Sequence, residues 1–206
     1  MSGAEVDAVV FDVGNVLLRW HPHNLYRRMG LSDAETAALL AETGLLAVNL
    51  ECDGGLPFAD GIARLVAAYP HRRSYLEAFD TRWTDLLDGA IEHNVAVLQE
   101  LKAHGVPVFA ITNFAREKFD VSRRLFPFLD AFDDIVVSGD VRCVKPDPAI
   151  YRLLIERQSL DTRRAVFIDD SRRNVDAAAA LGFRVIHVEN EAAPVREELR
   201  RLGLPV

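Results

Sequence analysis

Carboxylate, hydroxyl and amide side chains follow short apolar runs at several places in the sequence, and a lysine followed closely by prolines lies between two of these places. They are Asp12, Thr112, Asn113, Lys145, Asp169 and Asp170. An aspartate can attack phosphorus and form an aspartyl phosphate that water later hydrolyses. Carboxylates packed together repel one another, and a hard divalent cation such as Mg²⁺, which prefers oxygen ligands, relieves that repulsion. Brought together, these residue types would suit Mg²⁺-assisted phosphoryl transfer.

Each residue type has a role in such chemistry. Asp12 would be the nucleophile, and Lys145 would hold both that carboxylate and the anionic substrate. The Thr112 hydroxyl and the backbone amides after Asp12 would stabilise charge on the transferring phosphoryl oxygens. Asn113 would either orient the substrate or only hydrogen-bond its own turn. An aspartate shortly before Gly14 could also do no more than cap a turn.

These side chains converge only if the runs before them are neighbouring strands of one parallel sheet. Five runs are apolar at nearly every position, which is typical of strands covered on both faces. They are residues 8–11, 106–111, 134–137, 165–168 and 184–188. Helical patterns precede each of the last four of these runs, over residues 92–104, 116–125, 147–157 and 171–182. The third has Asp147 as its N-cap and Pro148 at its first helical position, and the fourth has Ser171 as its N-cap. This order predicts an α/β fold with a doubly wound parallel sheet.

A long segment interrupts the alternation after the first predicted strand. About 80 residues without a convincing strand precede the helix at Glu92, too many for a loop of a compact domain. The segment has helix signals of its own, with a capping box at Ser32 and Glu35, a helix opening at Pro57, and another helix over 73–87. We expect a catalytic core of residues 1–19 and 90–206 and an inserted helical cap subdomain of residues 20–89. Because ligands bind beyond the carboxyl ends of the strands in such sheets, the cap would lie over the site.

Composition excludes several classes of function. The 206 residues allow one domain with an insert. The net charge of −7 and the absence of long basic clusters argue against a nucleic-acid partner. The sequence has neither an apolar run of about 18 residues nor a signal-peptide pattern, so we expect a cytoplasmic protein with no membrane contact. Cys52 and Cys143 fit no disulfide framework or metal motif. The sequence does not reveal the oligomeric state.

Four segments resemble, in order, the motifs of the haloacid dehalogenase superfamily. They are Asp12-Val13-Gly14-Asn15-Val16-Leu17, Ile111-Thr112-Asn113, Ser138 with Lys145-Pro146-Asp147-Pro148, and Ile168-Asp169-Asp170-Ser171. The resemblance spans residues 6–188 and implies a Rossmann-like core, a helical cap and, most often, Mg²⁺-dependent phosphatase activity through Asp12. It also implies that the metal ligands are Asp12, the Gly14 backbone carbonyl and Asp170, with Asp169 close by.

The chain departs from this family at Gly14. Phosphatases of the family usually have a second aspartate there, which acts as general acid and base and contributes about 10² to 10⁴ in rate. Either the leaving group needs little protonation, as in a sugar 1-phosphate or an acyl phosphate, or an acid from the cap such as His21 or His23 replaces the aspartate. Members with an Asp-x-Gly-Asn-Val motif, including a glucose 1-phosphate phosphatase group, resemble this chain. We therefore expect a hydrolase of small phosphate esters.

Two other functions stay open at this point. In a 2-haloacid dehalogenase Asp12 would attack a halogen-bearing carbon to form an ester, and the halide needs no proton. Dehalogenases of this family are metal-free and usually have Ser-Asn-type residues where this chain has Asp169 and Asp170, so phosphate hydrolysis is favoured. The other alternative is a non-catalytic binding or regulatory domain of the same fold.

A few further residues have both a structural and a functional interpretation. Asn174 and Asp176 would form a second shell around the metal. Ser138 would hold either Lys145 or its loop. Aromatic residues of the insert are expected mainly in the cap core; these are Trp20, Phe58, Phe79 and Trp83.

Overall fold

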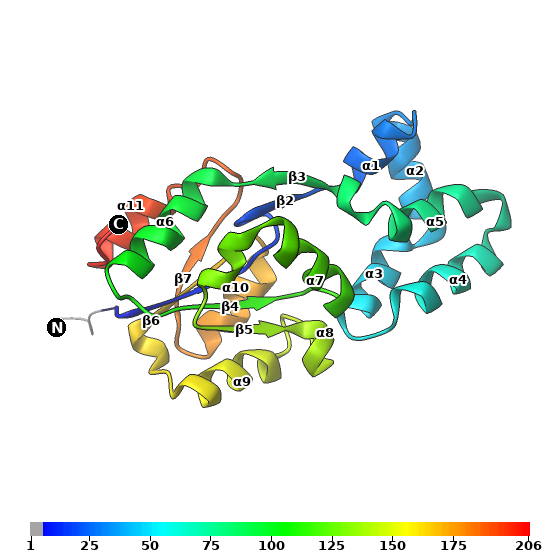
Figure 1. Cartoon of the computed structure of the whole chain (residues 1–206). Coiled ribbons are helices and arrows are strands. Elements are labelled where there is room, and N and C mark those ends of the chain that lie inside the picture. Colours follow the sequence, from blue (N-terminus) through cyan, green and yellow to red (C-terminus); the bar gives the residue numbers. More distant parts are fainter. Residues whose placement is uncertain (1–5) are drawn as a thin grey trace.

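The computed structural model, which describes residues 6–206, contains a five-stranded parallel sheet (Figure 1). Its strands are β1 (Ala8–Phe11), β4 (Val108–Thr112), β5 (Asp134–Val137), β6 (Ala165–Asp169) and β7 (Arg184–His187). They lie in the order β5-β4-β1-β6-β7, and every neighbouring pair is parallel. The carboxyl ends of β4, β1 and β6 are therefore adjacent, which is the condition for the predicted site to form.

All five predicted strands are present, with small shifts at their ends. The second begins at Val108 instead of residue 106, because Pro107 has no N–H to give to the sheet. Every residue of β1, β4 and β6 is buried, whereas the edge strands β5 and β7 are partly exposed. Burial on both faces explains why the central strands are apolar at successive positions.

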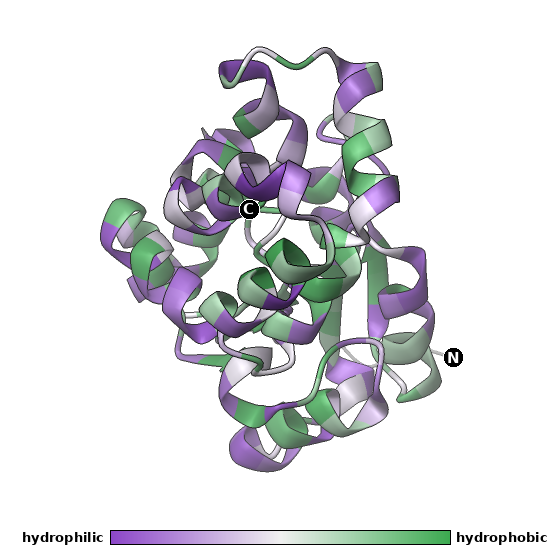
Figure 2. Ribbon diagram, turned by 90° about the vertical axis from the view of Figure 1, so that its right-hand side faces the viewer, coloured by the Kyte–Doolittle hydropathy of each residue, from purple (hydrophilic) through white to green (hydrophobic). Residues whose placement is uncertain are grey.

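Helices cover both faces of the sheet, as the predicted α/β fold requires. On one face α6 (Glu92–Ala103) and α11 (Val195–Arg201) pack against Val9 and Phe11. On the other face α9 (Pro148–Gln158) and α10 (Arg172–Ala180) pack against Ala8 and Val10. Figure 2 shows the hydrophobic strands, in green, among helices that also carry hydrophilic residues. The remaining elements of this part are α7 (Arg116–Leu125), α8 (Ser138–Val141) and the 3₁₀ turns η3 (Pro127–Ala131) and η4 (Thr162–Arg164).

Between β1 and α6 the chain forms a group of helices at one end of the molecule (Figure 1). These are α1 (Pro22–Arg28), α2 (Asp33–Thr43), α3 (Leu45–Asp53), α4 (Phe58–Ala68), α5 (Arg73–Thr81) and the 3₁₀ turns η1 (Pro70–Arg72) and η2 (Trp83–Leu86). The predicted capping box is present: the Ser32 hydroxyl accepts a hydrogen bond from the Glu35 N–H, and the Glu35 carboxylate accepts one from the Ser32 N–H. We call residues 20–89 the inserted segment.

The expectation that this region contains no strand is wrong. β2 (Leu18–Trp20) and β3 (Leu87–Ala90) pair antiparallel with a register irregularity. The helix predicted over 73–87 correspondingly ends at Thr81 and is followed by η2 and β3. Strands of three and four residues are too short to show an alternating pattern in the sequence. We propose this ribbon as the junction between the core and the cap subdomain.

The first five residues, which contributed to the expectation of a cytoplasmic protein, lie outside the described residues. Within residues 6–206, no helix combines the length and the apolarity needed to cross a membrane. Cys52 is buried and Cys143 is half-buried, and both are free thiols.

Candidate active site

Lys145 lies at the centre of the site, with its side chain only 1% exposed. Its ammonium group contacts Asp12 Oδ1 at 2.9 Å, Asp169 Oδ2 at 2.7 Å and the carbonyl oxygen of Ile111 at 2.8 Å. These three contacts use all three of its protons. Asn113 fixes the lysine backbone, because its side-chain amide accepts from the Lys145 N–H at 2.7 Å and donates to the Lys145 carbonyl at 3.0 Å. The amide thus bonds its turn, while the residue also lines the cavity described below.

The carboxylates of Asp12, Asp169 and Asp170 form a cluster, in which Asp12 and Asp169 contact this ammonium. One oxygen from each lies within 4.8 Å of the other two. Burial raises the pKa of Asp12 to about 7, where Lys145 opposes the shift and the two other carboxylates add to it. Burial and the nearby Asp169 also raise the pKa of Asp170. Burial acts to lower the pKa of Lys145, but Asp12 and Asp169 raise it above its ordinary value.

The cluster fits a hard divalent cation. Three ionised carboxylates and one ammonium sum to a charge of −2, and the donors are all oxygen, the ligand type of Mg²⁺. Asp12, Gly14 and Asp170 line the cavity and could present oxygens to an ion there. Asp169 is fully buried, and its oxygens already accept hydrogen bonds from Lys145, from the Ser171 N–H and twice from the Asn174 amide. Its lone pairs are thereby occupied, so it is better placed to orient Lys145 than to bind a metal.

The other predicted residues take different positions. Thr112 is buried at the end of β4 and is not among the residues that line the cavity, so its catalytic role stays a prediction. Ser138 holds the loop: its hydroxyl accepts from the Phe114 N–H at 2.8 Å and donates to the Asp53 carbonyl at 2.6 Å. The Asn174 amide donates to both oxygens of Asp169, and its place in a second shell around a metal stays a prediction. Asp176 does not reach the site and pairs with Arg172 at the surface.

The two histidines proposed as replacement acids lie at the start of α1. His21 Nδ1 accepts a hydrogen bond from the His23 N–H at 3.3 Å, and the His23 ring lies 3.2 Å from Asp33. Burial lowers the pKa of His21. Neither histidine is among the residues lining the cavity that contains Asp12.

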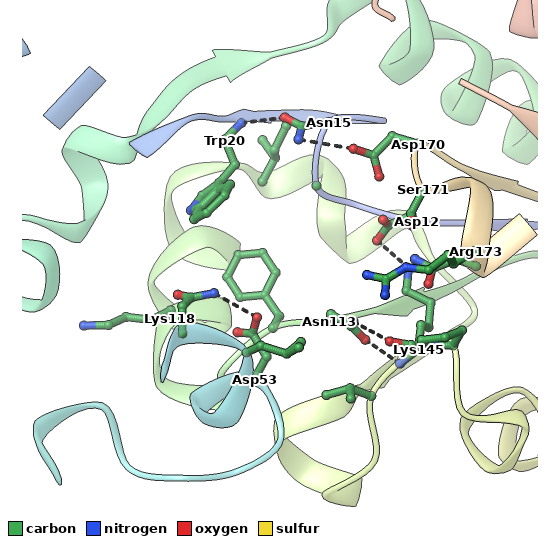
Figure 3. Close-up of a pocket in the computed structure, with 18 of the residues that line it drawn as sticks. Asp12, Asn15, Trp20, Asp53, Asn113, Lys118, Lys145, Asp170, Ser171 and Arg173 are labelled. Carbon is green, nitrogen blue, oxygen red and sulfur yellow. Dashed lines mark hydrogen bonds and ion pairs between the residues drawn. The ribbon is translucent and has the colours of Figure 1, made fainter. Parts of the chain in front are cut away.

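A cavity of about 340 Å³ lies beside Asp12 and Lys145 (Figure 3). The core contributes most of its polar groups, and the inserted segment contributes a second side that includes Trp20 and Asp53. Many of the remaining side chains are apolar: Leu18, Leu50, Trp83, Leu87, Phe114 and Val144. The cavity is therefore lined by residues of both the core and the inserted segment.

Asn15 and Arg173 are polar residues of this cavity to which the sequence analysis gave no role. Asn15 adopts a left-handed backbone with φ of 53°, which asparagine tolerates better than most residues. Its side chain accepts from the Trp20 N–H at 3.1 Å and donates to Asp170 at 3.3 Å, so it links the ribbon to the carboxylate cluster. Arg173 is exposed at the start of α10 and lines the same cavity, where its cation suits an anionic substrate.

Asp53, also missed, is the last residue of α3 and lies in the cavity on the side of the insert (Figure 3). It is only 9% exposed. Its Oδ1 accepts from the Ala115 N–H at 2.9 Å, and its Oδ2 accepts from the Asn49 amide at 3.0 Å. Burial raises its pKa to about 7, opposed by the Ala115 hydrogen bond. An aspartate before two glycines predicts only a helix end, so the sequence carries no signal for this burial.

The buried Asp53 carboxyl predicts a pH-dependent stability. Its native pKa of about 7 exceeds its ordinary value of 3.8, so the native state binds more protons between these values and its stability falls as the pH rises through that window. The loss is on the order of 4 kcal/mol. Asp53→Asn has no carboxyl to ionise and so avoids this loss of stability. We therefore expect the variant to be more stable to urea than the wild type at about pH 8, and the difference in stability to shrink toward about pH 4.

The matched control for this comparison is Asp60→Asn, which removes the same charge from an exposed position of α4. Because Asp60 is exposed, this variant controls for the loss of one negative charge and for the change from a carboxyl to an amide. If Asp53→Asn and Asp60→Asn showed the same pH dependence, the carboxyl at position 53 would ionise as an ordinary surface group does.

The site thus combines an acidic cluster and a buried lysine at the carboxyl edge of a parallel sheet. The model of the haloacid dehalogenase-like hydrolase family matches residues 55–188, which is more than half of the chain. The chain belongs to this family and is a hydrolase.

Curated relatives include both phosphatases and dehalogenases. The chain is 29% identical over 203 residues to a sesquiterpene phosphatase of Aspergillus oryzae, covering 95% of both chains. It is 28% identical over 207 residues to a phosphorylated carbohydrates phosphatase of Thermotoga maritima, covering 93% of this chain and 91% of the relative. An (S)-2-haloacid dehalogenase of a Pseudomonas species is 25% identical over 168 residues, which cover 78% of this chain and 67% of the relative. The hydrolase class is common to all three.

Solved structures show the same fold over nearly the whole chain. A HAD family enzyme from Bacteroides thetaiotaomicron superimposes with a TM-score of 0.74 at 18% identity, covering 95% of this chain and 99% of that one. The same enzyme has been crystallised with magnesium and inorganic phosphate, in a structure with a TM-score of 0.68, 19% identity, and coverage of 88% and 93%. The Rossmann-like fold predicted for the core is thereby confirmed.

Proposed function

We propose that this hydrolase is a Mg²⁺-dependent phosphatase that transfers a phosphoryl group from a small organic phosphate to Asp12 and then to water. The observation that supports this proposal is the charge of the site, where a cluster of three carboxylates, Asp12, Asp169 and Asp170, has a single ammonium beside it. That excess of negative charge suits the binding of a divalent cation together with a phosphate. In a site without a metal, the same charge would repel a carboxylate substrate. The magnesium and phosphate found with the Bacteroides enzyme support the same reading.

The residues around Asp12 suit a covalent mechanism. Oδ1 contacts the Val13 N–H at 2.7 Å and the Lys145 ammonium at 2.9 Å, which orients the carboxylate and leaves Oδ2 to attack phosphorus. As the Asp12–phosphorus bond forms, the bond to the leaving-group oxygen breaks. Water then attacks the phosphorus of the aspartyl phosphate, which releases inorganic phosphate and restores Asp12. Mg²⁺ held by Asp12, the Gly14 carbonyl and Asp170 would supply charge stabilisation on the phosphoryl oxygens.

The cavity walls bear on the substrate. Trp20, Trp83 and Phe114 offer aromatic surface beside the charged cluster, and such rings pack against apolar carbon groups as well as the apolar faces of sugars. Gly14 favours sugar 1-phosphates or acyl phosphates, whose leaving groups need little protonation. Glucose 1-phosphate is one candidate from this group. The sesquiterpene phosphatase relative adds terpenyl phosphates as a second candidate class.

The test is a panel of phosphate-release rates measured with Mg²⁺ and with excess chelator. The substrates are p-nitrophenyl phosphate, acetyl phosphate, glucose 1-phosphate, glucose 6-phosphate and farnesyl phosphate. We expect Mg²⁺-dependent release that falls about a hundredfold or more in chelator, because the carboxylate cluster then has no cation to balance it. Release should be faster from glucose 1-phosphate than from glucose 6-phosphate.

Chloride release from 2-chloropropionate, measured alongside, addresses the competing dehalogenase activity. The specific observation in its favour is Gly14, since a departing halide needs no acid. Metal-independent chloride release without phosphate release would replace the proposed function with dehalogenation. If neither product formed, the non-catalytic alternative would take its place.

A further inference from the structure

We propose that Asp53 is the general acid that protonates the leaving-group oxygen of the substrate. This proposal rests on the proposed function, since it names the proton donor for the same phosphoryl transfer. It would also explain how the enzyme could protonate a leaving group although the aspartate usual in the family is replaced by Gly14. The proposal is carried by the position of Asp53 in the cavity, by its hydrogen bonds and by the lack of another suitable donor among the residues that line it.

The first step concerns the residue that would ordinarily supply the proton. Gly14 lines the cavity without a side chain, and no heavy atom lies within 4 Å of the place where its Cβ would stand. No neighbouring group has moved into that space to substitute for the missing carboxyl. A substrate whose leaving group needs a proton must therefore receive it from another wall of the cavity.

The other side chains of the cavity that could donate a proton already have other partners or cannot release one. Asp12 and Asp170 belong to the carboxylate cluster, and Lys145 directs all three of its protons to protein oxygens. Lys118 pairs with Asp80 and lies over the ring of a phenylalanine. Arg173 cannot release a proton at neutral pH. Asp53 is the remaining carboxyl among the residues that line this cavity.

Asp53 also lies on the side from which a leaving group would be protonated. In phosphoryl transfer the attacking and leaving oxygens are roughly in line, so the leaving group lies away from the nucleophile. Figure 3 shows Asp12 and Asp53 on different sides of the same cavity, with Asp53 on the side of the insert. A substrate whose phosphoryl group meets Asp12 would thus direct its carbon portion toward the wall that holds Asp53.

The hydrogen bonds of Asp53 orient its carboxyl and leave it capacity to react. Each oxygen accepts one bond, from the Ala115 N–H and from the Asn49 amide, so each retains a lone-pair position. Burial and the Ala115 hydrogen bond are the causes of its pKa shift, and no charged side chain is among them. The charged groups on the elements around it are Glu51 on α3 and Glu117 and Lys118 on α7, and Lys118 pairs with Asp80. The pKa of about 7 produced by burial gives a substantial protonated fraction near neutrality, where general acids are most effective.

The proton balance closes over the two steps. As the bond between phosphorus and the leaving-group oxygen breaks, the Asp53 carboxyl gives its proton to that oxygen, and the alcohol departs. When water attacks the aspartyl phosphate, the Asp53 carboxylate accepts a proton from it. Asp53 returns to its protonated form, and Asp12 is regenerated as inorganic phosphate forms.

The experiment compares leaving groups in the wild type, Asp53→Asn and the matched control Asp60→Asn. The substrates are farnesyl phosphate or glucose 6-phosphate, whose alkoxides leave poorly, and p-nitrophenyl phosphate, whose phenolate leaves without protonation. We expect Asp53→Asn to lower kcat/KM about 10²-fold for the alkyl phosphate. For the aryl phosphate, the loss should stay below about threefold, because kcat/KM reports only the first transfer. Asp60→Asn should leave both values unchanged.

The ratio of alkyl to aryl kcat/KM does not depend on the folded fraction of the variant, so the readout survives partial unfolding. Equal losses on both substrates would overturn the proposal and make Asp53 a residue that only positions the start of α7. No loss on either substrate would overturn it as well. If the wild type released no phosphate even from p-nitrophenyl phosphate, the proposed function itself would fail, and that result is separate from any effect of the Asp53 variant.

Discussion

Asp12→Asn is expected to reduce kcat/KM for phosphate release by at least about 10⁴-fold, the scale on which enzymes lose rate when their nucleophile is removed. An amide oxygen cannot form the acyl phosphate that the mechanism requires. The substitution keeps the shape of the side chain and an oxygen that can accept from the Val13 N–H and from Lys145. The loss should therefore arise from chemistry, with the fold intact. The measurement is the initial rate with p-nitrophenyl phosphate at saturating Mg²⁺.

Stability measurements separate this effect from misfolding. Because burial raises the pKa of Asp12 to about 7, neutralising it should leave the metal-free protein at least as stable as the wild type at about pH 8. Asp176→Asn is the matched control, since it removes the same charge from a surface residue of α10 that pairs with Arg172. Near wild-type phosphate release by Asp12→Asn would rule out Asp12 as the nucleophile.

The sheet could be predicted from sequence because its strands are buried on both faces. That burial leaves a continuous apolar run, as in β1 and β6, and a polar residue at the end of the run is then conspicuous. Asp12 and Asp169 were found in this way, and the strand order places β1 between β4 and β6 so that their ends meet. The Lys145 ammonium lies 2.9 Å from Asp12 and 2.7 Å from Asp169, and these contacts could not be predicted from the spacing of the residues in the sequence.

The residues that could not be predicted depend on contacts across the chain. Asp53 is buried where the end of α3 meets the residue before α7, 62 positions further along, and the Ala115 N–H donates to its carboxylate there. No local pattern around Asp53 encodes that contact. The β2–β3 ribbon likewise pairs Leu18 with Ala90, and both of its strands are too short to show an alternation of apolar and polar residues. Sequence patterns report local burial, whereas the side of the inserted segment that lines the cavity depends on how distant segments pack.

Lys145→Met is expected to reduce both activity and stability. Methionine keeps much of the length and apolar stem of lysine but removes the ammonium that contacts Asp12 and Asp169. Breaking a buried ion pair by removing one partner costs about 3 to 5 kcal/mol. The carboxylates left behind should have pKa values raised further, so stability should fall more steeply with rising pH than in the wild type. Urea unfolding of the metal-free protein at about pH 5 and about pH 8 measures this.

A second substitution separates the two effects of the lysine. In Lys145→Met combined with Asp169→Asn, one buried charge of each sign has been removed, so most of the lost stability should return. Phosphate release should not return, because the cation that holds Asp12 for attack is still missing. Lys102→Met is the control, since Lys102 pairs with Asp133 at the surface, away from the site. A Lys145→Met protein as stable as the wild type at both pH values would contradict the charge balance from which the cation site is argued.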